Sequence, residues 1–379
     1  MQRFLNDEEK HWLKTTFQKF DTKMQKECER LGNKIPYIPE NGHYVDDMAE
    51  KDIGWWTNGF WGGIMWQMYH ATGTEIYRDK AENVEVLLDQ CLQEFTGLHH
   101  DVGFMWMHTA VANYRLTKNN KSFARGMHAA NILAGRFNVL GNFIRAWNGD
   151  RTGWMIIDCL MNLSILYWAT EETKDPRFAA IAVRHADTAL EKLLRPDGSS
   201  NHIAILNADN GEVLETPAGQ GFADGSSWSR GQSWAIYGFA ISYAHTKENR
   251  YLDAAKQVSH YFMANVALTN YLPLCDFRSP EEPIYYDSTA GACAACGLLE
   301  IAKHVSEYEK ALYVKSALKI LQAMDEHFCN WNEDEDGILG MGRAAYHNNR
   351  EDSHVPIIYG DYFYLEALLR LMDKDFWIW

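Results

Sequence analysis

The sequence predicts an all-α fold, a closed toroid of six helical hairpins. The chain has 379 residues, more than one compact core usually supports, so it forms either two domains or one domain built by repetition. One unit recurs along it. Small, polar or aromatic residues open a helical run of roughly 17 residues that ends in a polar turn, and such internal repeats indicate a repetitive architecture.

The opening of the unit occurs six times. It is found at residues 56–61, 101–106, 153–158, 230–234, 287–291 and 360–364. A polar break and an amphipathic helix follow each of the first five. The opening helices are apolar nearly all round, which places them inside, whereas one-sided helices belong outside. An amphipathic helix over about 7–31 has no earlier partner, and the sixth opening helix has no later one. These two would pair in a closed ring; the rival is an open helical solenoid.

Long irregular segments connect each outer helix to the next inner one, and all should emerge at one end of the ring. They span about 32–55, 139–152, 196–229, 268–286 and 330–359. Loops of this length are usually functional. Alternating residues at 142–147 and 202–206 predict short β-hairpins there. The order of elements places Asp101, Trp154, Asp158, Arg230 and Asp287 around one mouth, where the N-termini of the inner helices favour anions.

Composition excludes several classes of protein. Lys and Arg number 36 against 51 Asp and Glu, a net charge of −15 with no basic block, which argues against nucleic acid and anionic membranes as partners. No apolar stretch reaches the ~18 residues of a membrane span, and the first ten residues lack the apolar core of a signal peptide. Seven scattered cysteines are typical of reduced thiols, so we expect a cytoplasmic protein.

Two acidic residues are candidate catalytic groups. Asp158 stands alone in an apolar stretch, and a buried carboxylate is usually paired, protonated or functional. Burial should raise its pKa, which suits a general acid; the alternative is an acid that interacts with the helix dipole. Asp101 follows His99 and His100 and opens a helix, where an N-cap is the commoner role. Adjacent histidines do not share a helix face, so we expect no zinc site.

Other motifs are weaker. Segments 219–224 and 226–234 combine Trp, Gln, Arg and Ser, a composition that suits sugar binding. Nucleotide, kinase and serine-hydrolase motifs do not occur. The pair Cys293 and Cys296 is better explained by small residues at an interior helix contact. Residues 332–337 resemble the start of a calcium loop, but its twelfth position is Arg343 instead of Glu, which favours a solvated acidic turn.

Four segments together resemble one known family. They read HHDVGF at 99–104, IIDCLMN at 156–162, WSRGQSWA at 228–235 and WTNGFW at 56–61, and they resemble the unsaturated glucuronyl hydrolases of glycoside hydrolase family 88. The likeness runs through nearly the whole chain and ends at 360–363. It implies that residues 1–379 form a single (α/α)6 barrel catalytic domain of a bacterial enzyme that needs neither a metal nor an organic cofactor.

The resemblance also implies a substrate and a mechanism. The substrate would be an oligosaccharide with a 4,5-unsaturated uronic acid at its non-reducing end, such as lyases leave on chondroitin or hyaluronan. An acid protonates C4, water adds at C5, and the resulting hemiketal opens with loss of the aglycone. Asp158 would be the general acid/base, and Asp101 its partner, which holds substrate hydroxyls and raises the pKa of Asp158 through like charge. The remaining implied site residues are a stacking wall at Trp56 and the sugar- and carboxylate-binding residues His202, Gln220, Trp228 and Arg230.

Several alternatives stay open on the sequence. An unsaturated rhamnogalacturonyl hydrolase shares the ring and the chemistry, a sugar epimerase would need paired histidine bases, and a glycan-binding protein would need no acid in its pocket. Members that favour sulfated glycans tend to carry Ser and Lys in the loop before the last inner helix. Here 347–356 has one Ser and no Lys; Arg350 could substitute, so sulfate preference is undecided. A monomer or a weak homo-oligomer is expected.

Overall fold

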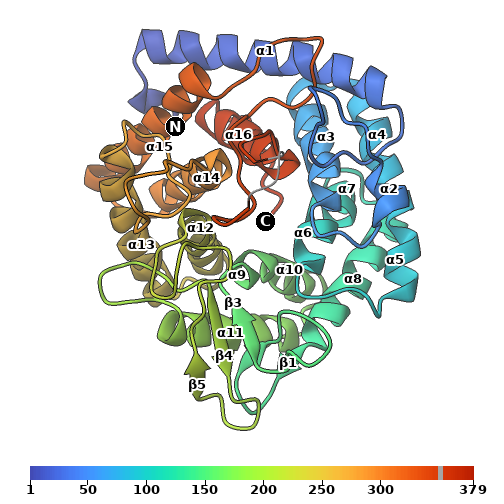
Figure 1. The fold of residues 1–379 in the computed structure, drawn as a ribbon. Coiled ribbons are helices and arrows are strands. Elements are labelled where there is room, and N and C mark those ends of the chain that lie inside the picture. Colours follow the sequence, from blue (N-terminus) through green and yellow to red (C-terminus); the bar gives the residue numbers. More distant parts are fainter. Residues whose placement is uncertain (349–352) are drawn as a thin grey trace.

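The fold is a ring of two concentric helical layers, shown in Figure 1 by a computed structural model that describes residues 1–348 and 353–379. The inner layer consists of α3 (Asn58–Thr72), α6 (Val102–Trp106) with a π-helical turn (Met107–Val111) and α7 (Ala112–Thr117), α9 (Cys159–Asn162) with α10 (Ser164–Thr173), α12 (Ser229–Thr246), α14 (Ser288–His304) and α16 (Ile358–Leu371). The outer layer consists of α1 (Asp7–Leu31), α4 (Glu75–Leu87) with α5 (Asp89–Glu94), α8 (Asn120–Ala134), α11 (Arg177–Lys192), α13 (Asn249–Ala267) and α15 (Glu307–His327). Two short helices, a 3-10 turn (Gln2–Phe4) and α2 (Met48–Lys51), lie in the N-terminal segments. The predicted six-hairpin barrel is confirmed.

Burial follows the predicted division between the layers. In α14 every residue from Ser288 to Ala302 is buried, because this helix is surrounded on all sides. In α11 the buried residues form one stripe between Phe178 and Ala189, as expected of an outer helix. Cys293 and Cys296 lie inside α14 and are free, which confirms their interpretation as small residues at interior contacts. None of the described helices is both long and apolar enough to cross a membrane.

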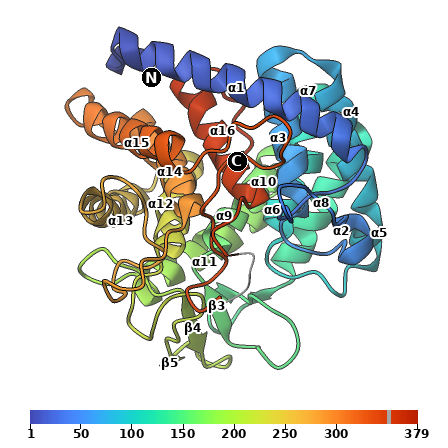
Figure 2. The same cartoon turned by 45° about the horizontal axis from the view of Figure 1, so that its top comes forward.

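The two ends of the chain close the ring. The last inner helix, α16, packs against the first, α3, and α1 lies against α16 (Figures 1 and 2). The buried Lys23 of α1 donates hydrogen bonds to the carbonyl oxygens of Asn330 (2.8 Å) and Gly337 (2.7 Å) in the last long loop. The barrel is therefore closed, and the open solenoid is excluded.

Small antiparallel sheets lie among the long loops. The first pairs β1 (Phe137–Asn138) with β2 (Phe143–Ile144), and the second has the order β3 (Trp154–Ile156), β4 (Ile203–Leu206), β5 (Val213–Glu215). One expectation was wrong: segment 153–158 does not open the third inner helix. It forms β3, in which Trp154 pairs with Ile205, and the helix begins only at Cys159.

The acidic turn at 332–337 also differs from its prediction. Asp336 is 4% exposed, accepts a hydrogen bond from the backbone N–H of Tyr44 (2.9 Å) and forms an ion pair with Arg30 (2.6 Å). The turn is not fully solvated, because the end of α1 reaches over it and buries this one carboxylate. It anchors the last loop to the outer layer.

The C-terminal tail fills the barrel at the C-terminal ends of the inner helices. Arg115, in the last turn of α7, donates to the carbonyl oxygens of Trp377 (2.8 Å), Ile378 (2.7 Å) and Trp379 (2.9 Å). The fully buried Trp379 indole donates to the Glu366 carboxylate at 3.0 Å. This end of the barrel is thus occupied by protein, and a ligand must enter from the end at which the inner helices begin.

Candidate active site

A cavity of about 580 Å³ opens where the inner helices begin. All but one of the long connecting segments contribute to its wall; 268–286 does not. The lining residues are Tyr37, Ile38, Trp55, Trp56, His99, His100, Asp101, Trp147, Ile156, Asp158, Gln220, Arg230, Ala344, Ala345, His347, Asn348 and Tyr359. The expected convergence of the long loops on one mouth is therefore observed, and both predicted catalytic acids lie in it.

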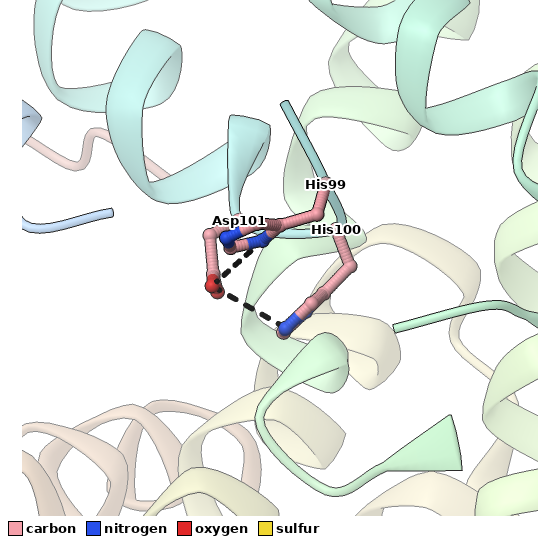
Figure 3. Close-up of side chains that lie close together, drawn as sticks. All are labelled: His99, His100 and Asp101. Carbon is pink, nitrogen blue, oxygen red and sulfur yellow. Dashed lines mark ion pairs between the residues drawn. The ribbon is translucent and has the colours of Figure 1, made fainter. Parts of the chain in front are cut away.

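Asp101 holds its carboxylate among donors. It directly precedes α6, but its side chain caps no backbone N–H of that helix, so the expected N-cap was wrong. His99 Nδ1 and His100 Nε2 each lie 3.3 Å from Oδ2 (Figure 3), and Asn162 donates to Oδ1 at 3.3 Å. Burial acts to raise the pKa of Asp101, but the neighbouring His100 and His99 rings and the Asn162 hydrogen bond outweigh it and hold the pKa below its ordinary value. Asp101 is consequently an anion at neutral pH.

The two neighbouring histidines converge on this carboxylate. Helix geometry was the reason for expecting them to diverge, but His99 and His100 lie in the turn before α6, where that geometry does not apply. Their rings stack with centroids 5.4 Å apart. Burial lowers the pKa of His100 to about 4, so its imidazole is neutral at neutral pH.

Asp158 faces the same cavity with one unsatisfied oxygen. Its Oδ1 lies 3.3 Å from His202 Nε2 and makes no hydrogen bond within the described part of the chain. The side chain is 14% exposed and does not cap α9. Asn162, one turn further along, donates to the Asp158 carbonyl oxygen (3.4 Å) as well as to the Asp101 carboxylate. One amide thus links the two acidic residues.

His202 is held in one tautomer. The backbone N–H of Gln220 donates to its Nδ1 at 3.0 Å, so the neutral ring carries its proton on Nε2, the nitrogen that faces Asp158. This contact requires glycine at position 219, which has φ +61° and whose added Cβ would lie 2.1 Å from Nδ1. The backbone turn at 219–220 therefore sets the orientation of His202.

Arg230 joins the cavity to a buried ion pair. Its Nη1 contacts Asp287 Oδ2 at 2.5 Å and the Arg343 carbonyl oxygen at 2.8 Å, and Nη2 donates to the Ala344 carbonyl oxygen at 2.6 Å. Burial opposes the charge of Arg230, but Asp287 more than offsets this and raises the pKa of the guanidinium. Arg230 thereby fixes the loop that forms one side of the cavity.

Two residues predicted at the mouth lie elsewhere. Asp287 is fully buried behind Arg230 and caps α14 through the backbone N–H of Thr289 (3.2 Å). Trp154 belongs to β3 and packs edge-on against Trp147, with centroids 5.6 Å apart, and Trp147 is the one that lines the cavity. Trp154 lies away from the cavity because its segment is a strand paired with β4, whereas we had expected the start of a helix.

The predicted sugar-binding residues divide into two groups. Trp56, Gln220 and Arg230 line the cavity, and the half-buried Trp56 packs on Tyr359 with centroids 5.0 Å apart. The other two, His202 and Trp228, form a layer behind it. Trp228 is 3% exposed, and its ring lies 4.4 Å from that of His202 and 4.6 Å from the guanidinium carbon of Arg230.

Sequence reasoning missed several residues of the site, namely Tyr359 and Trp147 in the cavity wall and Asn162, which is buried behind it. Asn162 could have been found, since it lies four residues after Asp158 and so on the same helix face. Tyr359 and Trp147 carried no comparable signal. In the loop predicted to govern sulfate preference, His347 and Asn348 line the cavity; Arg350 lies outside the described residues.

The sequence is similar to a known family of enzymes. A family model described as Glycosyl Hydrolase Family 88 matches residues 28–366. An unsaturated glucuronyl hydrolase of Bacillus sp. (strain GL1) is 35% identical over 90% of this chain and 92% of that protein. An unsaturated chondroitin disaccharide hydrolase of Streptococcus pneumoniae is 33% identical over 83% and 81%.

Solved structures give the same result. The unsaturated glucuronyl hydrolase structure from Bacillus sp. GL1 superimposes with a TM-score of 0.89 and 33% identity, covering 95% of this chain and 96% of that one. An unsaturated glucuronyl hydrolase specific for heparin gives 0.88 and 30%, covering 96% and 97%. The chain therefore belongs to glycosyl hydrolase family 88 and is a glycosidase.

Proposed function

We propose that this enzyme hydrolyses oligosaccharides that end in a 4,5-unsaturated uronic acid, derived from glycosaminoglycans such as chondroitin or hyaluronan. The observation that carries the proposal is the pair Asp101 and Asp158, which line one cavity and are linked by Asn162. Relatives that share 35% and 33% of the sequence bear the names unsaturated glucuronyl hydrolase and unsaturated chondroitin disaccharide hydrolase, which supports the same substrate class.

Asp158 would transfer the protons. In its protonated form it donates to C4 of the C4=C5 bond, and the positive charge that forms at C5 is shared with the ring oxygen. Water then adds at C5 and returns a proton to the Asp158 carboxylate. The resulting hemiketal opens and releases the aglycone, so the net reaction consumes one water. Because no displacement occurs at C1, the carboxylate separations that distinguish ordinary glycosidases do not apply.

The other wall residues would position the sugar. Asp101, as an anion, accepts hydrogen bonds from substrate hydroxyls; that its charge also helps Asp158 to keep a proton stays a prediction. Arg230 and Gln220 offer donors to the uronate carboxylate, and the Trp56 ring offers an apolar face to the sugar. His202 and Trp228 lie behind the cavity wall, so we assign them to positioning: His202 orients Asp158, and Trp228 supports His202 and Arg230.

The test follows the ultraviolet absorbance of the enol ether during incubation with an unsaturated chondroitin disaccharide. The wild-type chain should abolish the absorbance. Asp158→Asn should reduce turnover by roughly 10²- to 10⁴-fold, the usual contribution of a general acid. Asp187→Asn, on an outer helix where Asp187 is 45% exposed, is the matched control and should retain full activity. Unimpaired turnover by Asp158→Asn would exclude it as the acid.

A substrate panel separates the alternatives. Pectin-derived and glycosaminoglycan-derived unsaturated disaccharides, sulfated and plain, should be assayed side by side. Faster turnover of the pectin-derived substrate would favour an unsaturated rhamnogalacturonyl hydrolase, and binding without loss of absorbance would indicate a glycan-binding protein. The cytoplasmic location, the single catalytic domain over 1–379 and the monomeric or weakly oligomeric state stay predictions.

A further inference from the structure

We infer that His99, His100 and Asp101 form a binding site for a divalent cation of the zinc type at the wall of the cavity. The three residues are consecutive in the turn before α6, and Figure 3 shows both imidazoles directed at the Asp101 carboxylate. One ligand atom from each lies within 4.8 Å of the other two. Two imidazoles and a carboxylate are a donor set that zinc prefers.

The distances suit tetrahedral coordination. Zinc bonds to nitrogen and oxygen of 2.0–2.1 Å place two tetrahedral ligands about 3.3 Å apart. Both contacts of Asp101 Oδ2, with His99 Nδ1 and with His100 Nε2, measure 3.3 Å. The pairs therefore match two edges of the tetrahedron. His99 is 26% exposed and lines the cavity, so a fourth position is open to water or a small ligand.

A second observation points to a ligand independently. His100 is 1% exposed, and neither of its ring nitrogens makes a hydrogen bond within the described part of the chain. A buried polar group without a partner is costly and calls for an explanation. A cation bound by Nε2 would supply a partner.

Binding would occupy the carboxylate that the substrate needs. Under the proposed function Asp101 accepts substrate hydroxyls, so zinc at Oδ2 would compete with the sugar and inhibit hydrolysis. Zinc and copper should bind more tightly than manganese, and magnesium, which favours oxygen ligands, should not bind. The inhibition rests on the proposed function, whereas cation binding does not.

Calorimetric titration of the metal-free, full-length chain with zinc chloride tests the site. The chain has 15 histidines, so both stoichiometry and variants are needed. We expect one zinc per chain, bound at least about tenfold more weakly by His99→Gln and by Asp101→Asn. His128→Gln, at an exposed position of α8, is the matched control and should bind as the wild type does. Binding that His99→Gln leaves unchanged overturns the inference.

Two further readouts separate this site from the hydrolase. Cobalt added to the metal-free chain should give the strong visible absorption of tetrahedral coordination, and His99→Gln should lose it while its circular dichroism stays that of the wild type. Zinc should inhibit turnover of the unsaturated disaccharide, with relief by chelator. Zinc binding in a chain that lacks hydrolase activity would reject the proposed function alone, whereas hydrolysis without stoichiometric zinc binding would reject the cation site alone.

Discussion

Removal of the charge of Asp287 should destabilise the barrel strongly although this residue does not touch the cavity. Asp287 and Arg230 are 0% and 1% exposed, and their ion pair spans 2.5 Å. Asp287→Asn keeps the shape of the side chain and an oxygen for the helix cap, but it leaves an almost fully buried guanidinium without a counter-charge. The substitution therefore isolates the charge.

The magnitude follows from burial. Breaking a buried pair by removing one partner costs about 3–5 kcal/mol, because an uncompensated charge stays behind. The hydrogen bonds of Arg230 to the carbonyl oxygens of Arg343 and Ala344 still stabilise its charge in the variant. We therefore expect the unfolding free energy to fall by an amount near the lower end of this range. Against a total unfolding free energy of about 5–15 kcal/mol, a change of this size is readily measured.

The control comes from an exposed pair of similar geometry. Arg250 and Asp187 lie 2.7 Å apart on the outer layer, with side chains 40% and 45% exposed, so Asp187→Asn should cost no more than about 1 kcal/mol. Urea unfolding of both variants gives the comparison. Asp287→Asn should also raise KM, because Arg230 lines the cavity, whereas Asp187→Asn should leave KM unchanged. Equal destabilisation by the two variants would refute the reasoning.

Three further predictions concern other parts of the fold. Gly103→Ala should lower the unfolding free energy by about 1–3 kcal/mol and also reduce turnover, because the new Cβ would lie 2.6 Å from Asn162 Cα. Urea unfolding measures the first effect and the absorbance assay the second. A fully active variant would contradict this prediction. Trp379→Ala should cost about 3–5 kcal/mol, because the side chain is fully buried; a thermal midpoint within a degree of the wild type contradicts this. Burial raises the pKa of Asp361 from 3.8 to about 6. Between these pH values the folded state binds a proton at Asp361 that the unfolded state does not bind. The contribution of this residue to the unfolding free energy therefore falls by up to about 3 kcal/mol as pH rises from 4 to 6. Asp361→Asn should remove that part of the pH dependence in urea unfolding, and identical pH profiles of variant and wild type contradict it.

The sequence predicted the helical layers well, because their signal is local. The amphipathic helix expected over about 7–31 is α1 (Asp7–Leu31), and the apolar runs became inner helices. The main failure, segment 153–158, has a non-local cause. Trp154 pairs with Ile205, some fifty residues away, and helical periodicity carries no information about such a partner. The prediction of a solvated turn around Asp336 was wrong for a similar reason, because the burial of this residue depends on Arg30, which is distant in the sequence.

The site was predictable in its acids but not in their surroundings. Repeat order alone brought Asp101 and Asp158 to one mouth, and both line the cavity. The convergence of His99 and His100 on Asp101 depends on backbone angles in a turn, which residue types do not determine. The position of Asp287 behind Arg230 arises from a salt bridge across two inner helices. In each case the missing information was tertiary.

The two acids have different surroundings, and this difference supports the different roles that we propose for them. Asp101 has two imidazoles and an amide around its carboxylate, which stabilise an anion and suit a fixed hydrogen-bond acceptor. Asp158 Oδ1 makes no hydrogen bond in the described structure and lies 3.3 Å from His202 Nε2. The Asp101 carboxylate, with nitrogen groups around it, suits the acceptor role, which leaves Asp158, in the wall of the same cavity, for the proposed proton transfer. If the two assignments were exchanged, the proton would lie on Asp101, whose pKa is held below its ordinary value.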